Sequence, residues 1–170
     1  VAKKLEEAGV DGIDVGGAGG VSWAAVEHHR AREAGNKLKQ KIGLTFWDWG
    51  IPTVISLIEV TSSTKLATIA TGGVRTGIDI TKAVALGARC VGIASPLLKP
   101  AVKGTEKVVE KLNNIIAELK TAMFLSGAKS TADLNKIPLV VTGRTAEWLR
   151  ARGLEPETYA RRGMEEKADF

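Results

Sequence analysis

The stretch Ala70–Gly77, with the sequence ATGGVRTG, decides the fold class of this chain. It follows the apolar run Leu66–Ile69 and precedes the helical pattern Ile78–Leu86. Twin glycines where a strand passes into a helix let the backbone approach an anion and direct N–H groups at it. Arg75 adds a forked, permanent positive charge that suits phosphate oxygens. The stretch therefore predicts a phosphate site at the C-terminal end of a parallel strand.

Two further short apolar runs extend this pattern. Asp11–Val15 leads into the glycine-rich segment Gly16–Gly20, and Cys90–Ala94 follows the helical pattern. Nearly continuous apolar strands that alternate with helices predict βα units in one parallel sheet. Three such units cannot close an eight-stranded barrel, which typically takes about 250 residues. The chain is therefore either an open α/β sheet or the C-terminal part of a barrel.

The rest of the chain predicts helices and their connections. Helices are expected over residues 1–8, 23–33, 53–59, 77–87 and 145–152, with one helical turn at 131–134 and a brief β-like run at 138–142. Pro96 opens a long helical region that Gly104 interrupts. Apolar residues recur in it at i, i+3 and i+4 from Glu106 to Leu125, which is typical of an amphipathic helix. A polar connection is expected over Lys37–Gly43.

Composition sets the broad class of the protein. The 170 residues are 44% hydrophobic and 25% charged, which is typical of a globular domain with one core. The net charge of +5 is spread along the chain and aromatic residues are few, so we expect no nucleic-acid partner. Cys90 is the only cysteine and lies in an apolar run, which predicts a small core residue in a reduced, cytoplasmic protein. No apolar run has the length of a membrane span and no signal peptide is visible, so we expect no membrane association.

The first residues indicate that the chain is a part of something longer. It starts at Val1 rather than at Met, and Val1–Gly9 reads as a helix already under way that stops at a glycine. We therefore expect that an N-terminal portion is missing.

Other candidate residues leave two interpretations open. The four glycines of Gly16–Gly20 suit a flat or phosphorylated ligand, or a flexible loop, but the dinucleotide fingerprint is absent because no acidic residue follows at the right place. Asp14 stands at a strand end, where it either takes part in catalysis or caps a turn. His28 and His29 lie about 100° apart on a helix and cannot easily share a metal. The aromatic turn Phe46–Trp49 is an intersubunit patch or a core patch.

Several segments carry a resemblance to a known family. Ile13–Trp23 (IDVGGAGGVSW) resembles the strand-six loop of type 2 isopentenyl-diphosphate isomerases. Asp48–Thr53 (DWGIPT) is similar to their following helix start, and Gly72–Asp79 (GGVRTGID) resembles their strand-seven phosphate loop. Residues 82–88, 92–98 and 118–127 are similar to their strand-seven helix, strand eight and closing helix. The resemblance covers nearly the whole chain.

The resemblance implies a fold and a reaction. The fold is the C-terminal part, strands six to eight with their helices, of a (β/α)8 TIM barrel over residues 1–127, followed by an extension over 128–170 with short helices and a mobile tail. The reaction interconverts isopentenyl and dimethylallyl diphosphate without net redox change. The implied cofactors are FMN, kept reduced by NAD(P)H, and Mg²⁺, which holds the substrate diphosphate.

Seven positions of this chain match cofactor-binding positions of the family: Gly16, Val21, Gly73, Val74, Arg75, Ala94 and Ser95. The first two would line the flavin, and the other five would hold the FMN phosphate. The family commonly has Thr at position 21 and often Ser at position 16, so this chain would offer only backbone N–H groups there. The family's metal ligands and acid–base residues lie upstream of Val1, so no catalytic residue and no metal ligand is assigned here. The chain alone is expected to be inactive, with an open sheet edge prone to association.

Two alternatives remain beside the isomerase. One is another FMN barrel enzyme, an α-hydroxy-acid oxidoreductase or a glutamate-synthase-like domain; Gly16–Gly20 lacks the His and Arg that the former carries near strand six. The other is a non-catalytic phosphate-binding half barrel. The aromatic turn favours a homo-oligomer.

Overall fold

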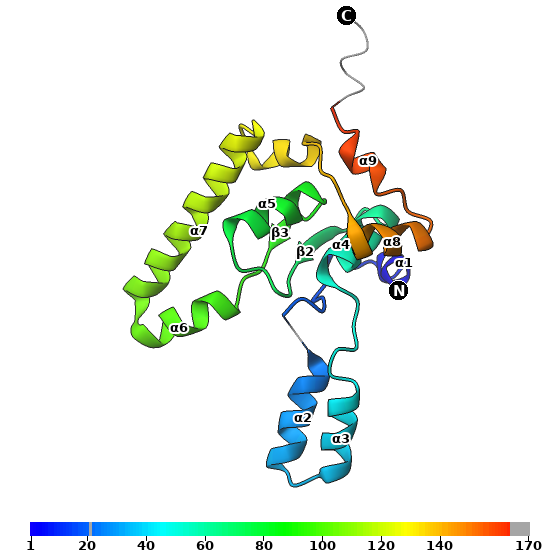
Figure 1. The fold of residues 1–170 in the computed structure, drawn as a ribbon, viewed down its shortest axis with the longest axis vertical. Helices are drawn as coiled ribbons and strands as arrows, with labels where there is room; N and C mark the ends of the chain where they lie inside the picture. The colour runs from blue at the N-terminus through cyan, green and yellow to red at the C-terminus, as the bar shows by residue number, and fades with distance from the viewer. Residues whose placement is uncertain (21, 164–170) are drawn as a thin grey trace, which may run out of the picture.

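A computed structural model describes residues 1–20 and 22–163 of the chain. Its elements are α1 (Ala2–Glu7), β1 (Gly12–Asp14), α2 (Trp23–Glu33), α3 (Lys37–Thr45), α4 (Thr53–Ser63), β2 (Ala67–Ala70), α5 (Gly77–Ala85), β3 (Cys90–Val91), α6 (Ser95–Lys103), α7 (Thr105–Ser126), the 3-10 helix η1 (Thr131–Lys136), α8 (Gly143–Ala151) and α9 (Glu157–Ala160). Figure 1 shows α4 and α5 beside the small sheet, α6 and α7 on one flank, and the C-terminal helices on the other.

The three strands form one parallel sheet in the order β1-β2-β3. This confirms the βα repetition predicted from the sequence. Asp14 pairs with Ile69, and Ile69 pairs with Cys90, so these three side chains share one face of the sheet. The alternate residues of β2, Thr68 and Ala70, are buried on the opposite face, where the helices pack. In a closed barrel the face with Asp14 points towards the barrel axis.

Cys90 corrects one prediction. The sequence places it in the core, but its residue is exposed in the structure. The reason is its register opposite Ile69, which puts it on the open face of the sheet rather than under the helices. The strand itself is also shorter than the predicted Cys90–Ala94 run. Its ladder ends at Val91 because the chain turns there towards α6, although the Gly92 N–H still donates to the carbonyl of Ala70.

The core lies between α4, α5 and the C-terminal extension. Leu57 and Ile58 of α4 pack with Leu86 after α5 and with Leu149 of α8. All four are 4% exposed or less. A residue that is buried in this way contributes about 1.5–3 kcal/mol, so the extension is part of the same hydrophobic core as the sheet helices.

The extension crosses the outside of the core as a strap. Leu134 of η1 and Pro156 before α9 are fully buried. The predicted β-like run 138–142 is not a strand in the structure; the Leu139 N–H donates to the carbonyl of Tyr159, and within the described part of the chain the run forms no strand ladder. The tail that the sequence predicts to be mobile begins at Glu155. Its first residues include α9 (Glu157–Ala160), and residues 164–170 lie outside the described part of the chain.

A second correction concerns Lys37–Gly43. The sequence predicts a polar connection, whereas the structure has α3 there. Asn36 begins this helix because its side chain accepts a hydrogen bond from the Lys39 N–H. Gly43 lets α3 approach α2, since a Cβ atom at Gly43 would lie 2.8 Å from the carbonyl oxygen of Ala24. Lysines alternate with other residues in this segment, so its apolar residues do not show a clear helical period in the sequence.

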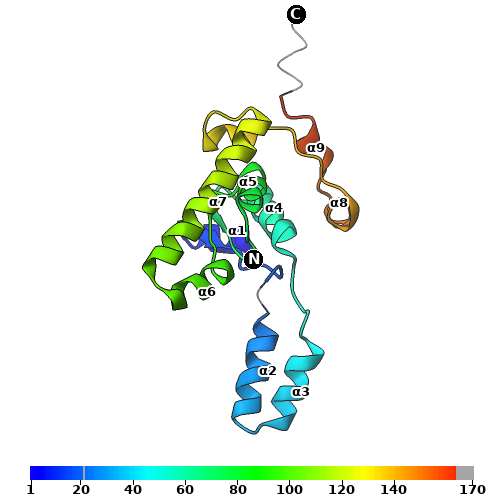
Figure 2. The same ribbon diagram turned by 60° about the vertical axis from the view of Figure 1, so that its left-hand side comes forward.

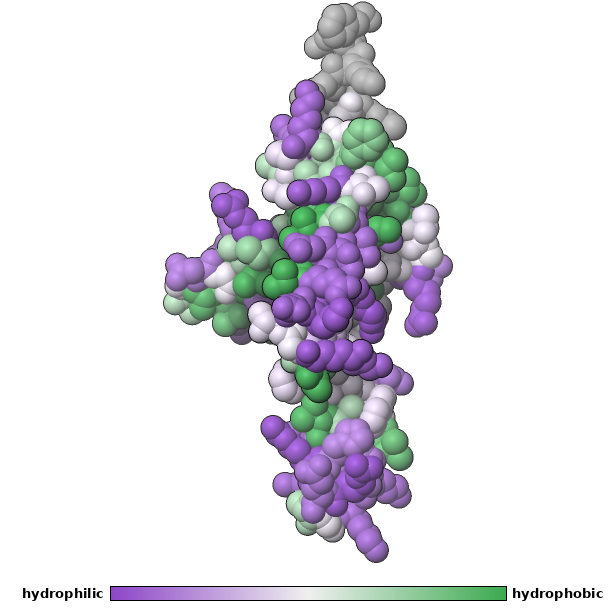
Figure 3. Space-filling view, turned by 90° about the vertical axis from the view of Figure 1, so that its left-hand side faces the viewer, coloured by the Kyte–Doolittle hydropathy of each residue, from purple (hydrophilic) through white to green (hydrophobic). Residues whose placement is uncertain are grey.

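Helices α2 and α3 form an antiparallel arm that projects from the body (Figures 1 and 2). Ser22 caps α2 as predicted, accepting from the Ala25 N–H. Large apolar side chains along the arm are exposed, among them Trp23 and Leu38, each at 71%. Figure 3 shows that hydrophilic residues separate the apolar patches on one flank of the molecule. In the described part of the chain, no helix combines the length and apolar character needed to cross a membrane.

Candidate functional site

The two glycine-rich segments lie against each other at the C-terminal ends of β1 and β2. The Gly17 N–H donates to the carbonyl of Thr71, which joins the first loop to the start of the twin-glycine turn. Gly72 and Gly73 have positive φ angles of 98° and 85°, conformations that favour glycine. A Cβ atom at Gly73 would lie 2.0 Å from the carbonyl oxygen of Gly19. The turn therefore requires glycine both for its dihedral angles and for the close approach of the loop.

The start of α4 joins the same assembly. The Thr53 hydroxyl donates to the carbonyl of Gly72 at 2.7 Å. The carbonyl of Ile51 accepts from the Ala18 N–H at 2.9 Å. The segment Asp48–Thr53 thus holds one glycine segment through the Ile51 carbonyl and the other through the Thr53 hydroxyl. Three segments that are far apart in the sequence meet at one end of the sheet.

Asp14 braces the first loop. Its Oδ1 accepts hydrogen bonds from the Gly16 N–H and from the Thr71 hydroxyl. The Thr71 hydroxyl is in turn 3.1 Å from the Gly16 nitrogen. Of the two roles left open for Asp14, the structure shows the turn cap. Thr71 is the partner that sequence reasoning missed; its place at the end of a strand directly before the twin glycines was the available signal.

Carboxylates already occupy the N-terminus of α5. Asp79 Oδ2 accepts from the N–H groups of Arg75 and Thr76, each at 3.0 Å, and the Thr76 hydroxyl accepts from the Asp79 N–H in return. This is a capping box. Glu118 of α7 accepts from the Gly77 N–H at 2.7 Å. An incoming phosphate therefore cannot use the first amides of α5 without displacing a carboxylate.

These contacts also set the acidity of Asp79. Partial burial raises the pKa of this carboxyl, but the hydrogen bonds from Arg75 and Thr76, together with the charge of Lys82, outweigh burial. The net pKa lies below the ordinary value for aspartate. Asp79 is therefore ionised at neutral pH and keeps the cap in place.

Other amides at the same end of the sheet stay open. No acceptor in residues 1–20 and 22–163 takes the N–H groups of Gly73, Val74, Ala94 or Ser95. Helix α6 begins at Ser95 without a side-chain cap, and Ala94 and Ser95 are exposed. Uncapped amides at a helix start favour an anion. The Arg75 guanidinium is also exposed, and its Nη1 donates to the Gly73 carbonyl at 3.1 Å.

The predicted site residues are therefore distributed over two neighbouring turns. Gly16, Gly73, Val74 and Arg75 belong to the interlocked assembly of the first two strand ends. Ala94 and Ser95 follow β3, the next strand of the sheet, and among the described residues no hydrogen bond joins them to the twin-glycine turn. Val21 lies outside the described residues. A cavity of about 130 Å³ adjoins Gly72, Gly73 and Val74 and is lined on its other sides by α4 and α5.

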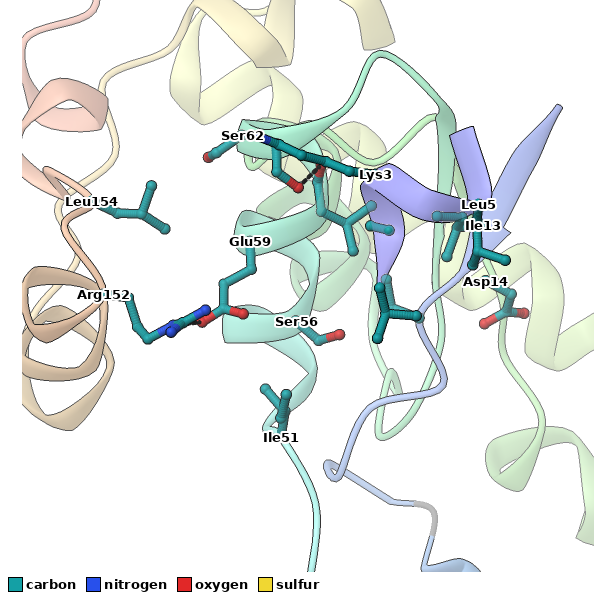
Figure 4. Close-up of a pocket in the computed structure, with 15 residues that line it drawn as sticks. Lys3, Leu5, Ile13, Asp14, Ile51, Ser56, Glu59, Ser62, Arg152 and Leu154 are labelled. Atoms are coloured by element: carbon teal, nitrogen blue, oxygen red, sulfur yellow. Dashed lines mark hydrogen bonds and ion pairs between the residues drawn. The ribbon is translucent and has the colours of Figure 1, made fainter. Parts of the chain in front are cut away.

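A larger cavity lies elsewhere and contains none of these residues. It measures about 620 Å³ and lies between α1, β1, α4 and the turn that follows α8. Figure 4 shows the Glu59 and Arg152 side chains pointing towards each other across it; Arg152 Nε is 3.0 Å from Glu59 Oε1. It borders the outer edge of β1 through Ile13, Asp14 and Val15. The cavity adjoins the assembly of glycine segments through Asp14 and Ile51, but none of the predicted cofactor-binding residues that the structure describes lines it.

The histidines of the arm have structural contacts. His28 Nδ1 lies 2.9 Å from the carbonyl oxygen of Gln40 on α3. The rings of His28 and His29 both meet Trp47 edge to face. Among the residues that the structure describes, no group of three His, Cys, Asp or Glu side chains is arranged to hold a metal ion. Phe46 packs edge to face on Trp49, and neither ring is buried.

Two sequence relatives match nearly the whole of this chain. The isopentenyl-diphosphate delta-isomerase of Thermococcus kodakarensis is 50% identical over 165 residues, which cover 96% of this chain and 43% of the relative. The isopentenyl-diphosphate delta-isomerase of Methanothermobacter thermautotrophicus is 49% identical over 161 residues, covering 95% of this chain and 44% of the relative. The resemblance to this group is thereby confirmed, and the chain spans about two fifths of the length of these curated relatives.

Solved structures share the fold. A GMP reductase from Trypanosoma brucei in complex with guanosine 5'-triphosphate matches with a TM-score of 0.54 and 26% identity, over 80% of this chain and 29% of that one. A flavocytochrome b2 variant with benzoylformate matches with a TM-score of 0.50 and 26% identity, over 78% of this chain and 36% of that one. The three parallel strands are thus the α/β portion of a TIM-barrel fold, as predicted from the sequence.

The family model described as FMN-dependent dehydrogenase matches residues 1–140. This range includes both glycine segments, the start of α4, the start of α6 and the whole of α7. It ends within the strap, before α8. The chain belongs to the FMN-dependent dehydrogenase family.

Proposed function

We propose that this chain forms the FMN-binding C-terminal strands of an isopentenyl-diphosphate delta-isomerase. The observation that carries the proposal is the meeting of Gly16–Gly20, Asp48–Thr53 and Gly72–Gly77 at one end of the sheet. The same segments carry the resemblance to the isomerases, and relatives that are about half identical over nearly the whole chain bear that name. The whole reaction belongs to a protein of the relatives' length.

The described residues fit the phosphate of FMN. Gly73 and Val74 offer N–H groups without an acceptor among the described residues, and so do Ala94 and Ser95 at the next strand end. Arg75 adds the positive charge that a phosphate dianion needs. The carboxylates on the first amides of α5 direct the anion away from that helix and towards the uncapped start of α6. We therefore assign the phosphate to the space bounded by Gly73, Arg75 and Ser95.

The first glycine loop would line the flavin ring. Gly16 is exposed and has a positive φ of 44°, so it would present its backbone to the ring without a side chain, with its N–H already donated to Asp14. Asp14 and Thr71 hold the loop in that position. Reduced FMN, when bound, supplies acid–base chemistry at the allylic carbons of the substrate. The part of this chain is to bind the cofactor by its phosphate and to orient its ring.

Finer features of the proposal follow the family resemblance. They are NAD(P)H as the reductant, Mg²⁺ on the substrate diphosphate, isopentenyl and dimethylallyl diphosphate as substrates, a homo-oligomeric state and a cytoplasmic location. Metal and acid–base residues are assigned to no position of this chain. Each of these features stays a prediction.

The test is conversion of isopentenyl diphosphate by the full-length protein. The purified protein is supplied with FMN, a reductant and Mg²⁺ without oxygen, and dimethylallyl diphosphate is measured. We expect bound flavin, visible by its absorbance, and product that depends on reduction of the flavin. Flavin without isomerisation would contradict the substrate and favour another FMN barrel enzyme. Absence of flavin would favour a non-catalytic phosphate-binding half barrel.

A further inference from the structure

A carboxylate of helix α7 takes an amide at the start of α5. Glu118 Oε2 accepts a hydrogen bond from the Gly77 N–H at 2.7 Å, although the two residues are 41 positions apart. Glu118 is half-buried and lies in the middle of α7, and Gly77 is buried. A buried N–H at a helix start requires an acceptor, and a negative charge there also suits the helix dipole. Glu118 meets both requirements from another element.

The backbone of α7 leaves no room for a side chain at position 77. A Cβ atom at Gly77 would lie 2.3 Å from the Leu119 nitrogen and 2.5 Å from the Ile115 carbonyl oxygen. Gly77 has no positive φ, so this glycine is required by the close approach and not by its dihedral angles. The carboxylate and the close contact together fix the first turn of α5 against α7.

The same turn holds the residues that we assign to the cofactor phosphate. Asp79, two residues beyond Gly77, accepts from the Arg75 and Thr76 N–H groups. The Arg75 guanidinium then donates to the Gly73 carbonyl. Hydrogen bonds thus connect the first turn of α5 to Arg75 and Arg75 to Gly73. A shift of Gly77 would therefore displace the backbone of Arg75 and, with it, the open amides of the twin-glycine turn.

We propose that Glu118 is a positioning residue for the cofactor-phosphate turn: from α7 it fixes the start of α5 and thereby the placement of Gly73 and Arg75. The proposal rests on the proposed function for the identity of the ligand. Its structural half, the anchoring of the turn, is independent of that function. Glu118 touches no ligand in this account and acts through Gly77.

The experiment compares three variants of the full-length protein. Glu118→Ala removes the acceptor, Glu118→Gln keeps an acceptor oxygen without the charge, and Glu110→Ala is the matched control. Glu110 lies on the same helix, is exposed and pairs with Lys107; among residues 1–20 and 22–163 it makes no hydrogen bond or ion pair to α5. The measurements are the dissociation constant of FMN, hydrogen exchange of peptides over residues 74–80 and 53–63, and the melting temperature.

We expect Glu118→Ala to weaken FMN binding about tenfold or more, the usual scale for a hydrogen bond to a charged group. Exchange at 74–80 should rise while exchange at 53–63 in α4 stays unchanged. Glu118→Gln should keep FMN affinity and exchange over residues 74–80 close to the wild-type values. Glu110→Ala should match the wild type in both measurements. Unchanged exchange at 74–80 in Glu118→Ala overturns the proposal, as does a Gln variant as impaired as the Ala variant.

Two further outcomes separate this inference from the proposed function. If exchange rises equally at 53–63 and the melting temperature falls in proportion, Glu118 supports the whole fold, and the positioning role is refuted. If the wild type binds no FMN, the proposed function fails, and exchange at 74–80 still decides whether Glu118 anchors the turn.

Discussion

The α-carbon of Gly73 lies against the carbonyl oxygen of Gly19, so closely that a Cβ atom at Gly73 would be 2.0 Å from that oxygen. This contact locks the twin-glycine turn after β2 onto the glycine loop after β1. The two segments thus form one surface at the end of the sheet rather than two separate loops.

Gly73→Ala is expected to disrupt this surface. The substitution meets a positive φ and a backbone oxygen that cannot move without shifting the first loop. We expect a loss of about 1–3 kcal/mol in the free energy of unfolding and at least tenfold weaker FMN binding. Gly127→Ala is the control, since Gly127 also has a positive φ but nothing lies within 4 Å of its Cβ position. Equal effects of both substitutions on FMN binding would refute the role of the contact.

Arg75→Ala is expected to weaken FMN binding by about 1.5–3 kcal/mol, the scale of a hydrogen bond to a charged group. The guanidinium is exposed, so the melting temperature should change little. The FMN affinity of Arg75→Lys should lie between those of the wild type and Arg75→Ala, because lysine keeps the positive charge but lacks the forked guanidinium. Arg144→Ala, an exposed arginine on α8, controls for net charge. Flavin titration measures all three, and unchanged affinity in Arg75→Ala contradicts the assignment.

Asp14→Ala is expected to loosen the first glycine loop. It removes the acceptor that the Gly16 N–H and the Thr71 hydroxyl share. Since the site is exposed, we expect an effect of about 1 kcal/mol on FMN binding, with faster hydrogen exchange over residues 15–20. Asp14→Asn keeps an oxygen acceptor and should retain most of the affinity. A loss of isomerase activity in Asp14→Asn with normal flavin binding would instead indicate a catalytic role.

The cap of α5 predicts a pH dependence of stability. The pKa of Asp79 is lowered in the folded state, so its contribution is complete above the unfolded value of about 3.9 and is lost as the pH falls through the folded pKa. Asp79→Ala should therefore lower the free energy of unfolding by about 1 kcal/mol at pH 7. The difference between wild type and variant should shrink below about pH 4. Urea unfolding at several pH values measures it, and a constant difference down to pH 3 would show that the carboxylate charge is irrelevant.

Leu149→Ala tests the contribution of the C-terminal strap. Leu149 is fully buried against Leu57 and Ile58. Truncation of a buried leucine costs about 2–5 kcal/mol. Leu98→Ala on α6 is the control, because Leu98 is 65% exposed and should lose less than about 0.5 kcal/mol. Chemical denaturation gives the free energy of unfolding of both variants. Similar losses of stability would mean that the strap is not part of the core.

Local sequence signals predicted the elements well where one periodicity dominates. The apolar runs at β1, β2 and β3 and the long pattern of α7 were recognised because each has a single period. The helix α3 was missed because its lysines interrupt the apolar face, and only its contact with α2 through Gly43 shows that face. Cys90 was misplaced because an apolar run does not say which face of a strand is covered.

The candidate site also has features that the sequence predicts and features that only the tertiary structure shows. The sequence by itself determined the βα order and the glycine, arginine and Pro-Thr segments, because turn chemistry and strand–helix alternation are local properties of the chain. Only the tertiary structure decided that Asp14 is held by Thr71, that Glu118 takes the Gly77 amide, and that the strap completes the core. These contacts join residues 41 to 92 positions apart, and no local pattern specifies which distant partner will satisfy a given amide or fill a given gap.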